Sequence, residues 1–280
     1  MKVRLLSHEA MKGSLNMAVD EAILRSAIRG ETGPTLRFYQ WKPACLSLGY
    51  FQDVKKEVDL EALPSQGVDL VRRLTGGKAV LHDDELTYSV VVPEVMLPGT
   101  VLETYRRISQ ALVEGLRLMG VPATIAALER GVTSRDPRFR QAACFSAPSW
   151  FEILWDGKKL IGSAQNRKGG MILQHGSIPF TFDAAKLVRC IRTTSPEHAL
   201  RAESMLKRKA AGVSEALGRA VERRELEDHL KAGFVEALGW ELESGNLTPN
   251  EEAEARSLAE AKYRNDAWTM ERGRHEEELY

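Results

Sequence analysis

Apolar positions near the N-terminus repeat at the spacing of three and four residues that is typical of an amphipathic helix. This spacing predicts a helix over about 15–29, with Ser14 as a candidate cap. Its apolar face consists of Leu15, Val19, Ala22, Ile23 and Ala27. Shorter apolar runs, separated by Pro and Gly, then predict a series of β-strands. These strands lie at 36–41, at 45–50, up to 71–72, at 85–92 and at 121–125.

A second amphipathic helix is predicted over about 101–119, between the last two of these strands. An irregular, Arg-rich segment then occupies 127–148, and loops of this length within a compact domain are usually functional or disordered. Two apolar runs follow at 151–155 and 158–164. They are joined by Asp156-Gly157, and Asp-Gly between apolar runs is the strongest short-range signal for a β-hairpin.

The last third of the chain changes in character. Residues 170–182 predict one more strand, and charged amphipathic helices begin at about residue 184. One of these helices carries apolar residues at steps of four, namely Leu226, Leu230, Phe234 and Leu238. The residues from Pro249 predict a last helix and a charged tail. Together the elements predict an α+β fold, in which a mainly antiparallel β-sheet is flanked by helices.

The composition is that of a soluble globular protein without a charge bias. A chain of 280 residues with 43% hydrophobic residues can bury one substantial core. Lysine plus arginine and aspartate plus glutamate both number 39, which argues against non-specific binding of nucleic acid. No apolar run approaches the roughly 20 residues of a membrane span, and the first residues do not resemble a signal peptide. We therefore expect a cytoplasmic protein that does not associate with a membrane.

Three widely spaced cysteines without a Cys-x-x-Cys pair, Cys45, Cys144 and Cys190, fit a reducing cytosol rather than a disulfide framework or a zinc site. Cys144 ends the irregular segment just before the predicted hairpin. The hairpin carries Lys158 or Lys159 back toward that segment, and a neighbouring ammonium ion favours the nucleophilic thiolate. The alternative is that Cys144 is a small buried residue that fills a gap, because free cysteine is among the most buried residue types.

A second candidate site is the Gly76-Gly77 pair. Paired glycines let the backbone approach a ligand closely and expose N–H groups to a carbonyl or phosphate oxygen. The pair is not part of a P-loop, because Lys78 is followed by Ala79 rather than by Ser or Thr. A simple turn between two strands is the alternative.

Two histidines occur in motif-like surroundings. The run His-Asp-Asp-Glu at 82–85 does not favour a metal site, because a strand places alternate residues on opposite faces. His175, in Gln-His-Gly-Ser-Ile at 174–178, is more simply a structural histidine than a catalytic base. The arginines of 127–148 form either a solvated face or a surface that docks an acidic carrier protein.

Several motifs, taken in their order along the chain, carry a family resemblance. They are Asn-Met-Ala-Val-Asp-Glu at 16–21, Arg-Phe-Tyr-Gln-Trp at 37–41, Leu-Gly-Tyr-Phe-Gln at 48–52, Arg-Arg-Leu-Thr-Gly-Gly at 72–77, His-Asp-Asp-Glu-Leu-Thr-Tyr-Ser at 82–89, Cys-Phe-Ser-Ala-Pro-Ser-Trp at 144–150, Lys-Leu-Ile-Gly-Ser-Ala-Gln at 159–165 and Leu-Gln-His-Gly-Ser-Ile at 173–178. The chain resembles the biotin/lipoate protein ligase superfamily, and within it the cysteine-dependent octanoyltransferases of Gram-positive bacteria. The resemblance covers about 14–268.

The resemblance implies an acyltransferase catalytic domain over 1–247, followed by a C-terminal helix and charged tail over 248–280. Cys144 would take an octanoyl group from octanoyl-acyl carrier protein as a thioester. Lys159 would lower the pKa of the thiol and orient the acyl carbonyl. A lysine of a lipoyl domain, with the glycine cleavage H protein as the expected acceptor, would then attack and leave an amide. The implied substrate-binding residues are Arg72, Thr75, Gly76, Gly77, His82, Gly162, Ser163, Ala164 and His175.

The resemblance also implies a monomer that needs no metal, nucleotide or other cofactor. Exchange between thioesters is close to neutral in free energy and thioester-to-amide transfer is downhill, so ATP is unnecessary. ATP-using lipoate ligases usually carry a third glycine where this chain has Lys78 and Gly-Asn where it has Glu85-Leu86. They also lack a cysteine at the position of Cys144. Three alternatives stay open: an amidotransferase that moves octanoyl from the H protein to E2 subunits, an ATP-dependent ligase, and a non-enzymatic acyl- or cofactor-binding module.

Overall fold

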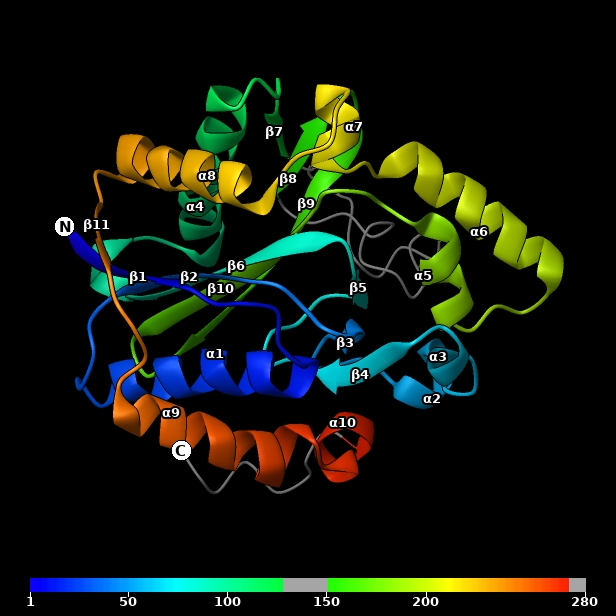
Figure 1. Ribbon diagram of the computed structural model, residues 1–280, viewed down its shortest axis with the longest axis horizontal. Helices are drawn as coiled ribbons and strands as arrows, with labels where there is room; N and C mark the ends of the chain where they lie inside the picture. The colour runs from blue at the N-terminus through cyan, green and yellow to red at the C-terminus, as the bar shows by residue number, and fades with distance from the viewer. Residues whose placement is uncertain (128–150, 272–280) are drawn as a thin grey trace.

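A mixed eight-stranded β-sheet forms the centre of the molecule (Figure 1). The computed structural model describes residues 1–127 and 151–271 of the chain. The strands follow one another across the sheet in the order β11-β1-β2-β6-β10-β9-β8-β7. Their bounds are β1 Lys2–Ser7, β2 Thr35–Tyr39, β6 Glu85–Pro93, β7 Thr124–Ala127, β8 Phe151–Trp155, β9 Lys158–Lys168, β10 Met171–Pro179 and β11 Glu241–Ser244. Strand β1 pairs in parallel with β11 and β2, and the other pairs are antiparallel.

A smaller three-stranded sheet, β4-β3-β5, contacts β10 through β5. Its strands are β3 Ala44–Leu48, β4 Val68–Arg72 and β5 Val80–His82. Strand β3 pairs in parallel with β4 and antiparallel with β5. The segment 73–79 connects β4 to β5, and its Thr75 contacts His175 on β10. The glycine pair of that segment is thereby held between the two sheets.

Helices cover both faces of the large sheet (Figure 1). Helices α1 (Gly13–Ile28) and α9 (Pro249–Leu258) lie on one face, and α4 (Val101–Leu118) and α8 (Arg223–Leu238) lie on the other. Strand β6 shows the consequence, because Val90 and Val92 belong to the core cluster with α4 and α8, whereas Val91 belongs to the cluster with α1 and α9. A strand with both faces covered needs apolar side chains on both sides. This explains the uninterrupted Val-Val-Val run.

The remaining helices, of which all but α6 have at most seven residues, surround the small sheet and the ends of the large one. They are α2 Val54–Glu57, α3 Ala62–Ser65, α5 Ala184–Cys190, α6 Pro196–Lys209, α7 Val213–Leu217 and α10 Asp266–Glu271, with a 3₁₀ turn η1 at Glu94–Met96 and a π-helical turn η4 at Ala259–Tyr263. Helices α5 and α6 share a third core cluster with the small sheet. Within 1–127 and 151–271, no helix is long and apolar enough to cross a membrane.

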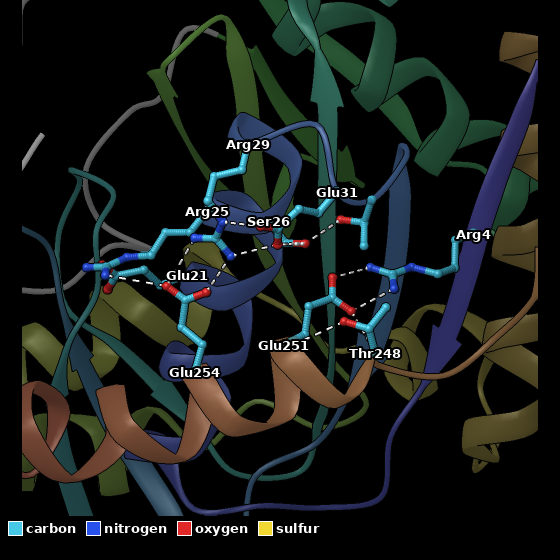
Figure 2. A network of polar contacts seen from close by, with 10 residues as sticks. Arg4, Glu21, Arg25, Ser26, Arg29, Glu31, Thr248, Glu251 and Glu254 are labelled. Carbon is cyan, nitrogen blue, oxygen red and sulfur yellow. Dashed lines mark hydrogen bonds and ion pairs between the residues drawn. The ribbon is translucent and has the colours of Figure 1, made fainter.

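Figure 2 shows the polar contacts that fix α9 against α1 and β1. Both terminal nitrogens of Arg4 donate to the Glu251 carboxylate, at 2.7 and 2.6 Å, and Glu251 also forms a capping box with Thr248. Arg29, just after α1, pairs with Glu254 at 2.8 Å. Such bidentate pairs fix orientation as well as distance. The C-terminal helix therefore packs on the same core as α1, while the domain boundary expected after residue 247 stays a prediction.

The α+β fold predicted from the sequence is confirmed, with β1–β2, β1–β11 and β3–β4 as its parallel pairs. The hairpin is also confirmed, because Asp156 and Gly157 have φ values of 48° and 72°, as a type I′ turn requires. Strand β7 begins at Thr124, later than the predicted start at 121. Strands β1, β5 and β11 were not predicted. They have six, three and four residues, and β1 pairs with residues more than two hundred positions away, so local pattern carries little signal.

Candidate active site

A pocket lies between the two sheets and has an empty volume of about 350 Å³, its open mouth included. Strands β9, β10 and β6 line one side, β3 and β5 line the other, and α1 contributes Met17. Five of the residues expected to bind substrate line this pocket: His82, Gly162, Ser163, Ala164 and His175.

The first polar system of the pocket links Thr75, His175 and Asp20. The Nε2 atom of His175 lies 2.7 Å from Thr75 Oγ1, and its Nδ1 atom lies 3.2 Å from Asp20 Oδ2. Burial raises the pKa of Asp20, but the nearby Arg37 and His175 more than offset this, so the pKa is lowered from its ordinary value. A carboxylate can only accept hydrogen bonds, so we assign the imidazole proton to Nδ1. In this tautomer Nε2 accepts a hydrogen bond from the Thr75 hydroxyl.

Asp20 is buried and held from three sides. Arg37 donates to its Oδ1 at 2.6 Å, while the Tyr39 hydroxyl donates to Oδ2 at 2.9 Å. The Arg37 guanidinium also reaches Asn16 Oδ1 at 2.8 Å and His8 Nδ1 at 2.9 Å. A buried charge persists only where it is paired and its hydrogen-bonding groups are satisfied. This network therefore fixes His175 against α1 and β2.

A second polar system links Ser47, His82 and Glu85. His82 Nε2 lies 2.8 Å from Ser47 Oγ, and its Nδ1 lies 3.5 Å from Glu85 Oε1. Burial lowers the pKa of His82, and the opposing effect of Glu85 is smaller, so the ring is neutral at neutral pH. Its Nδ1 atom has no hydrogen-bond partner among the described residues, and the nearby Glu85 carboxylate favours the proton on this nitrogen by its charge alone. The imidazole also stacks on Trp41, with ring centroids 3.9 Å apart and planes 14° from parallel.

Arg73 joins the two systems. Its Nε donates to Thr75 Oγ1 at 3.1 Å, and its Nη1 donates to the carbonyl and hydroxyl oxygens of Ser47 at 3.0 and 3.2 Å. Its Nη2 donates to the carbonyl oxygens of Gly76 and Lys78 at 2.7 and 2.8 Å. One guanidinium thus positions both hydroxyl partners of the histidines and the turn that contains the glycine pair.

The glycine pair itself is packed closely against a neighbouring loop. A Cβ atom on Gly49 would lie 2.0 Å from the carbonyl oxygen of Gly77, and Gly77 has a φ of 93° that side chains rarely allow. Thr75, Gly76 and Gly77 are not among the described lining residues, but Thr75 contacts His175 and Gly76 contacts Arg73, which both line the pocket. The predicted turn is present, and its role in substrate binding stays a prediction.

Arg72 lies apart from the pocket. Its guanidinium donates to backbone carbonyl oxygens of the 49–52 loop and of α10, at 2.7 to 3.2 Å. The Trp268 indole donates back to the Arg72 carbonyl at 2.9 Å. The observed role of this arginine is to hold the C-terminal helix and the Gly49 loop together. A substrate-binding role for Arg72 stays a prediction.

Lys159 lies on β9, three positions before Gly162, and its buried amine pairs with Glu152 Oε1 at 3.1 Å. The neighbouring Lys158 pairs with Glu215 at 2.5 Å. Lys159 is not among the described residues that line the pocket. Cys144 lies outside the described residues, so its distance from Lys159 stays a prediction.

The sequence patterns did not identify Asp20, Arg73, Trp41 or Glu85 as site residues. A signal for Asp20 existed, because an acid occupies a buried position within the apolar pattern of α1. The other three lie within motifs of the family resemblance, where residue type alone does not indicate a contact. Across the residues that the structure describes, no group of three or more His, Cys, Asp or Glu side chains could hold a metal ion.

Comparison with known proteins places this site in a family. Residues 12–235 match the family model described as the lipoyl protein ligase A/B catalytic domain. A relative from Symbiobacterium thermophilum named Octanoyltransferase LipM is 46% identical over 267 residues, covering 95% of this chain and 97% of its own. A second, from Moorella thermoacetica and of the same name, is 44% identical over 273 residues, covering 96% and 98%.

A similar solved structure comes from a study of an archaeal lipoylation system in Thermoplasma acidophilum, a bipartite lipoate protein ligase with its E2 lipoyl domain. Its TM-score is 0.80 at 27% identity, and the match covers 96% of both chains. The family model covers most of the chain, and the octanoyltransferases match nearly all of it. The chain therefore belongs to the lipoyl protein ligase A/B catalytic-domain family and, within it, to the octanoyltransferases.

Proposed function

We propose that this protein transfers an octanoyl group from octanoyl-acyl carrier protein to a lysine of a lipoyl domain, in lipoate biosynthesis. The glycine cleavage H protein is the acceptor that we expect. The observation that carries the proposal is the small pocket beside β9 in a member of the octanoyltransferase family. Complete burial of a chain of about eight carbons would contribute roughly 0.8 kcal/mol per CH₂, or about 5 kcal/mol in total.

The reaction that we propose has two steps and uses Cys144 as the nucleophile. In the first step the thiolate attacks the acyl carbon of the donor thioester, a new thioester forms, and the carrier leaves as a thiolate. In the second step the acceptor lysine, as a free amine, attacks the acyl-enzyme. An amide forms, the thiolate of Cys144 is released, and the amine loses a proton. Dividing one transfer into two easier ones is the usual gain of covalent catalysis.

Lys159 is the group that we propose to activate the thiol. Its amine is buried and held in place by the ion pair with Glu152 at the start of β9, before the pocket-lining segment of that strand. A fixed ammonium ion lowers the pKa of a nearby thiol, because it stabilises the thiolate. It also orients an acyl carbonyl by attracting its oxygen. No nucleotide takes part in either step.

Intact-mass spectrometry tests the covalent step. The protein mixed with octanoyl-acyl carrier protein should gain the mass of one octanoyl group. Hydroxylamine, which cleaves thioesters, should remove the added mass, and Cys144→Ala should prevent it. Cys45→Ala and Cys190→Ala serve as controls, because both thiols are buried and burial raises the pKa of each. An octanoyl group that still attaches to Cys144→Ala would overturn the assignment.

The ATP-dependent ligase is the second candidate, because the similar archaeal structure is a lipoate protein ligase. It is tested by supplying free octanoate or lipoate with Mg-ATP and measuring modified lipoyl domain. The amidotransferase would use the same cysteine and lysine, and a comparison of octanoyl-carrier protein with octanoyl-H protein as the donor separates it from the proposed reaction. A non-enzymatic acyl-binding module would form no acyl-enzyme with any donor.

A further inference from the structure

The pocket runs along one face of the large sheet, across its strands, from β9 toward β2. Its lining passes from Gly162 on β9 to His175 on β10 and Thr87 on β6, and ends at Trp41, just after β2. Three strand spacings of about 4.8 Å give a span of about 14 Å. Lys159 lies at the β9 side, where the proposed function places the acyl carbonyl. The far end of the acyl chain would therefore approach the side at which Trp41 lies.

A rigid aromatic pair lines the pocket on that side. The indole of Trp41 stacks on the imidazole of His82 at 3.9 Å between ring centroids. Trp41 Nε1 donates to Thr87 Oγ1 at 2.8 Å, and His82 Nε2 lies 2.8 Å from Ser47 Oγ. Each ring is thus held by the other and by one hydroxyl group. Both residues are almost completely buried, at 5% and 6% exposure.

The pair presents carbon atoms to the pocket although it contains two polar rings. The nitrogen atoms of His82 face Ser47 and Glu85, and the indole N–H faces Thr87. What remains for a ligand is the edge and face carbon atoms of neutral rings. Such a surface suits the methyl end of a saturated chain, and its fixed position limits how long that chain can be.

We propose that the stacked pair of Trp41 and His82 is the end wall of the acyl pocket and determines the length of the acyl chain that the protein accepts. This inference rests on the proposed function. Val80 is a second position at which the end of the pocket can be changed by substitution. It lies two positions before His82 on β5, on the same face, and also lines the pocket.

The test is a chain-length profile of acyl-enzyme formation with carrier proteins that bear six, eight, ten or twelve carbons. Trp41→Leu and Val80→Ala enlarge the end of the pocket. Acyl-enzyme formation with the ten-carbon donor should therefore increase relative to the eight-carbon donor. Each additional buried CH₂ contributes about fourfold, or about 15-fold for two. Val80→Phe fills the same space and should shift the preference to six carbons. If Val80→Ala and Val80→Phe shift the preferred chain length in opposite directions, loss of folding cannot be the cause.

Trp240→Leu is the matched control. Trp240 is as buried as Trp41 and stacks on Phe234 at 5.2 Å, but it lies in the core with α8, away from the pocket. This variant should lose stability and keep the preference for eight carbons. An unchanged profile in both Val80 variants, or a shifted profile in Trp240→Leu, would overturn the inference. Absence of acylation of the unmodified protein by every donor would instead overturn the proposed function itself.

Discussion

Substitution of Asp20 by asparagine should destabilise the protein and change the proton position on His175. The carboxylate accepts from Arg37 through Oδ1 and from Tyr39 and His175 through Oδ2. The amide of the variant would offer one accepting oxygen in place of two. If that oxygen stays with Arg37, the amide N–H groups face Tyr39 and His175. The Nδ1 atom of His175 must then accept a hydrogen bond, and its proton moves to Nε2, toward Thr75.

The energetic cost follows from the burial of the pair. The side chains of Arg37 and Asp20 are 1% and 2% exposed. Removal of one partner from a buried ion pair costs about 3–5 kcal/mol. The lower end applies here, because Arg37 keeps Asn16 and His8 as further acceptors. We therefore expect a loss of about 3 kcal/mol, which lowers the midpoint of thermal unfolding by about 6–12 °C.

Two measurements check this prediction. Urea unfolding of Asp20→Asn and of a surface control, Asp228→Asn, gives the free energies. Asp228 is half exposed and pairs only with exposed or partly exposed cations, so its substitution should change stability by less than about 0.5 kcal/mol. ¹⁵N NMR of the imidazole nitrogens reports the proton position on His175. A loss below about 1 kcal/mol together with an unchanged His175 spectrum would refute the role given to the Asp20 carboxylate.

Three further predictions follow from single contacts. Lys159→Ala should fold but acylate slowly at pH 7 and recover as the pH approaches about 8.5, the ordinary pKa of a thiol; normal acylation at pH 7 would contradict its role. Burial and a neighbouring arginine lower the pKa of His8 to about 4. The folded protein then binds fewer protons than the unfolded chain between pH 4 and 6.5, so stability should fall as the pH drops through this window. The shift corresponds to about 3 kcal/mol, reduced to about 1–2 for partial exposure, and unfolding curves of His8→Asn should show a flatter pH dependence. Gly49→Ala places a Cβ atom 2.0 Å from the Gly77 carbonyl oxygen, and a resulting displacement of the turn by about 1 Å should slow acylation about 100-fold, whereas Gly33→Ala, with open space around it, should acylate normally.

The sequence predicted the elements whose signal is local. Helix α1, the hairpin of β8 and β9, and strand β6 each carry a periodic pattern or a turn signal within their own residues. Strands β1 and β11 do not, because a short strand is defined by its partner, and the partner of Lys2 is Glu241. The periodicity of one sequence does not indicate which distant segment a strand pairs with.

The site was predictable to a similar extent. Motifs identified His82, His175 and the Gly162–Ala164 segment, which line the pocket. They did not separate Arg72 from Arg73, which are adjacent in one motif. Arg72 is the last residue of β4 and Arg73 is the first of the connecting segment; Arg72 reaches the C-terminal helix, while Arg73 reaches the hydroxyl partners of the histidines. Which of the two reaches the site depends on where the large sheet lies, and this is decided by tertiary packing.

The charged residues around the pocket balance one another. Arg37 and Arg73 are two cations, and Asp20 and Glu85 are two anions, so this group is electrically neutral only when its histidines are neutral. Protonation of His82 would add an uncompensated charge to a buried region, and burial accordingly lowers the pKa of this ring. Asp20 orients the ring of His175, stacking on Trp41 orients the ring of His82, and the hydroxyls of Thr75 and Ser47 satisfy Nε2 of each. A wall that contains polar rings can thus present carbon to a hydrocarbon chain, because the indole N–H of Trp41 and Nε2 of His82 are already bound to the hydroxyl groups of Thr87 and Ser47.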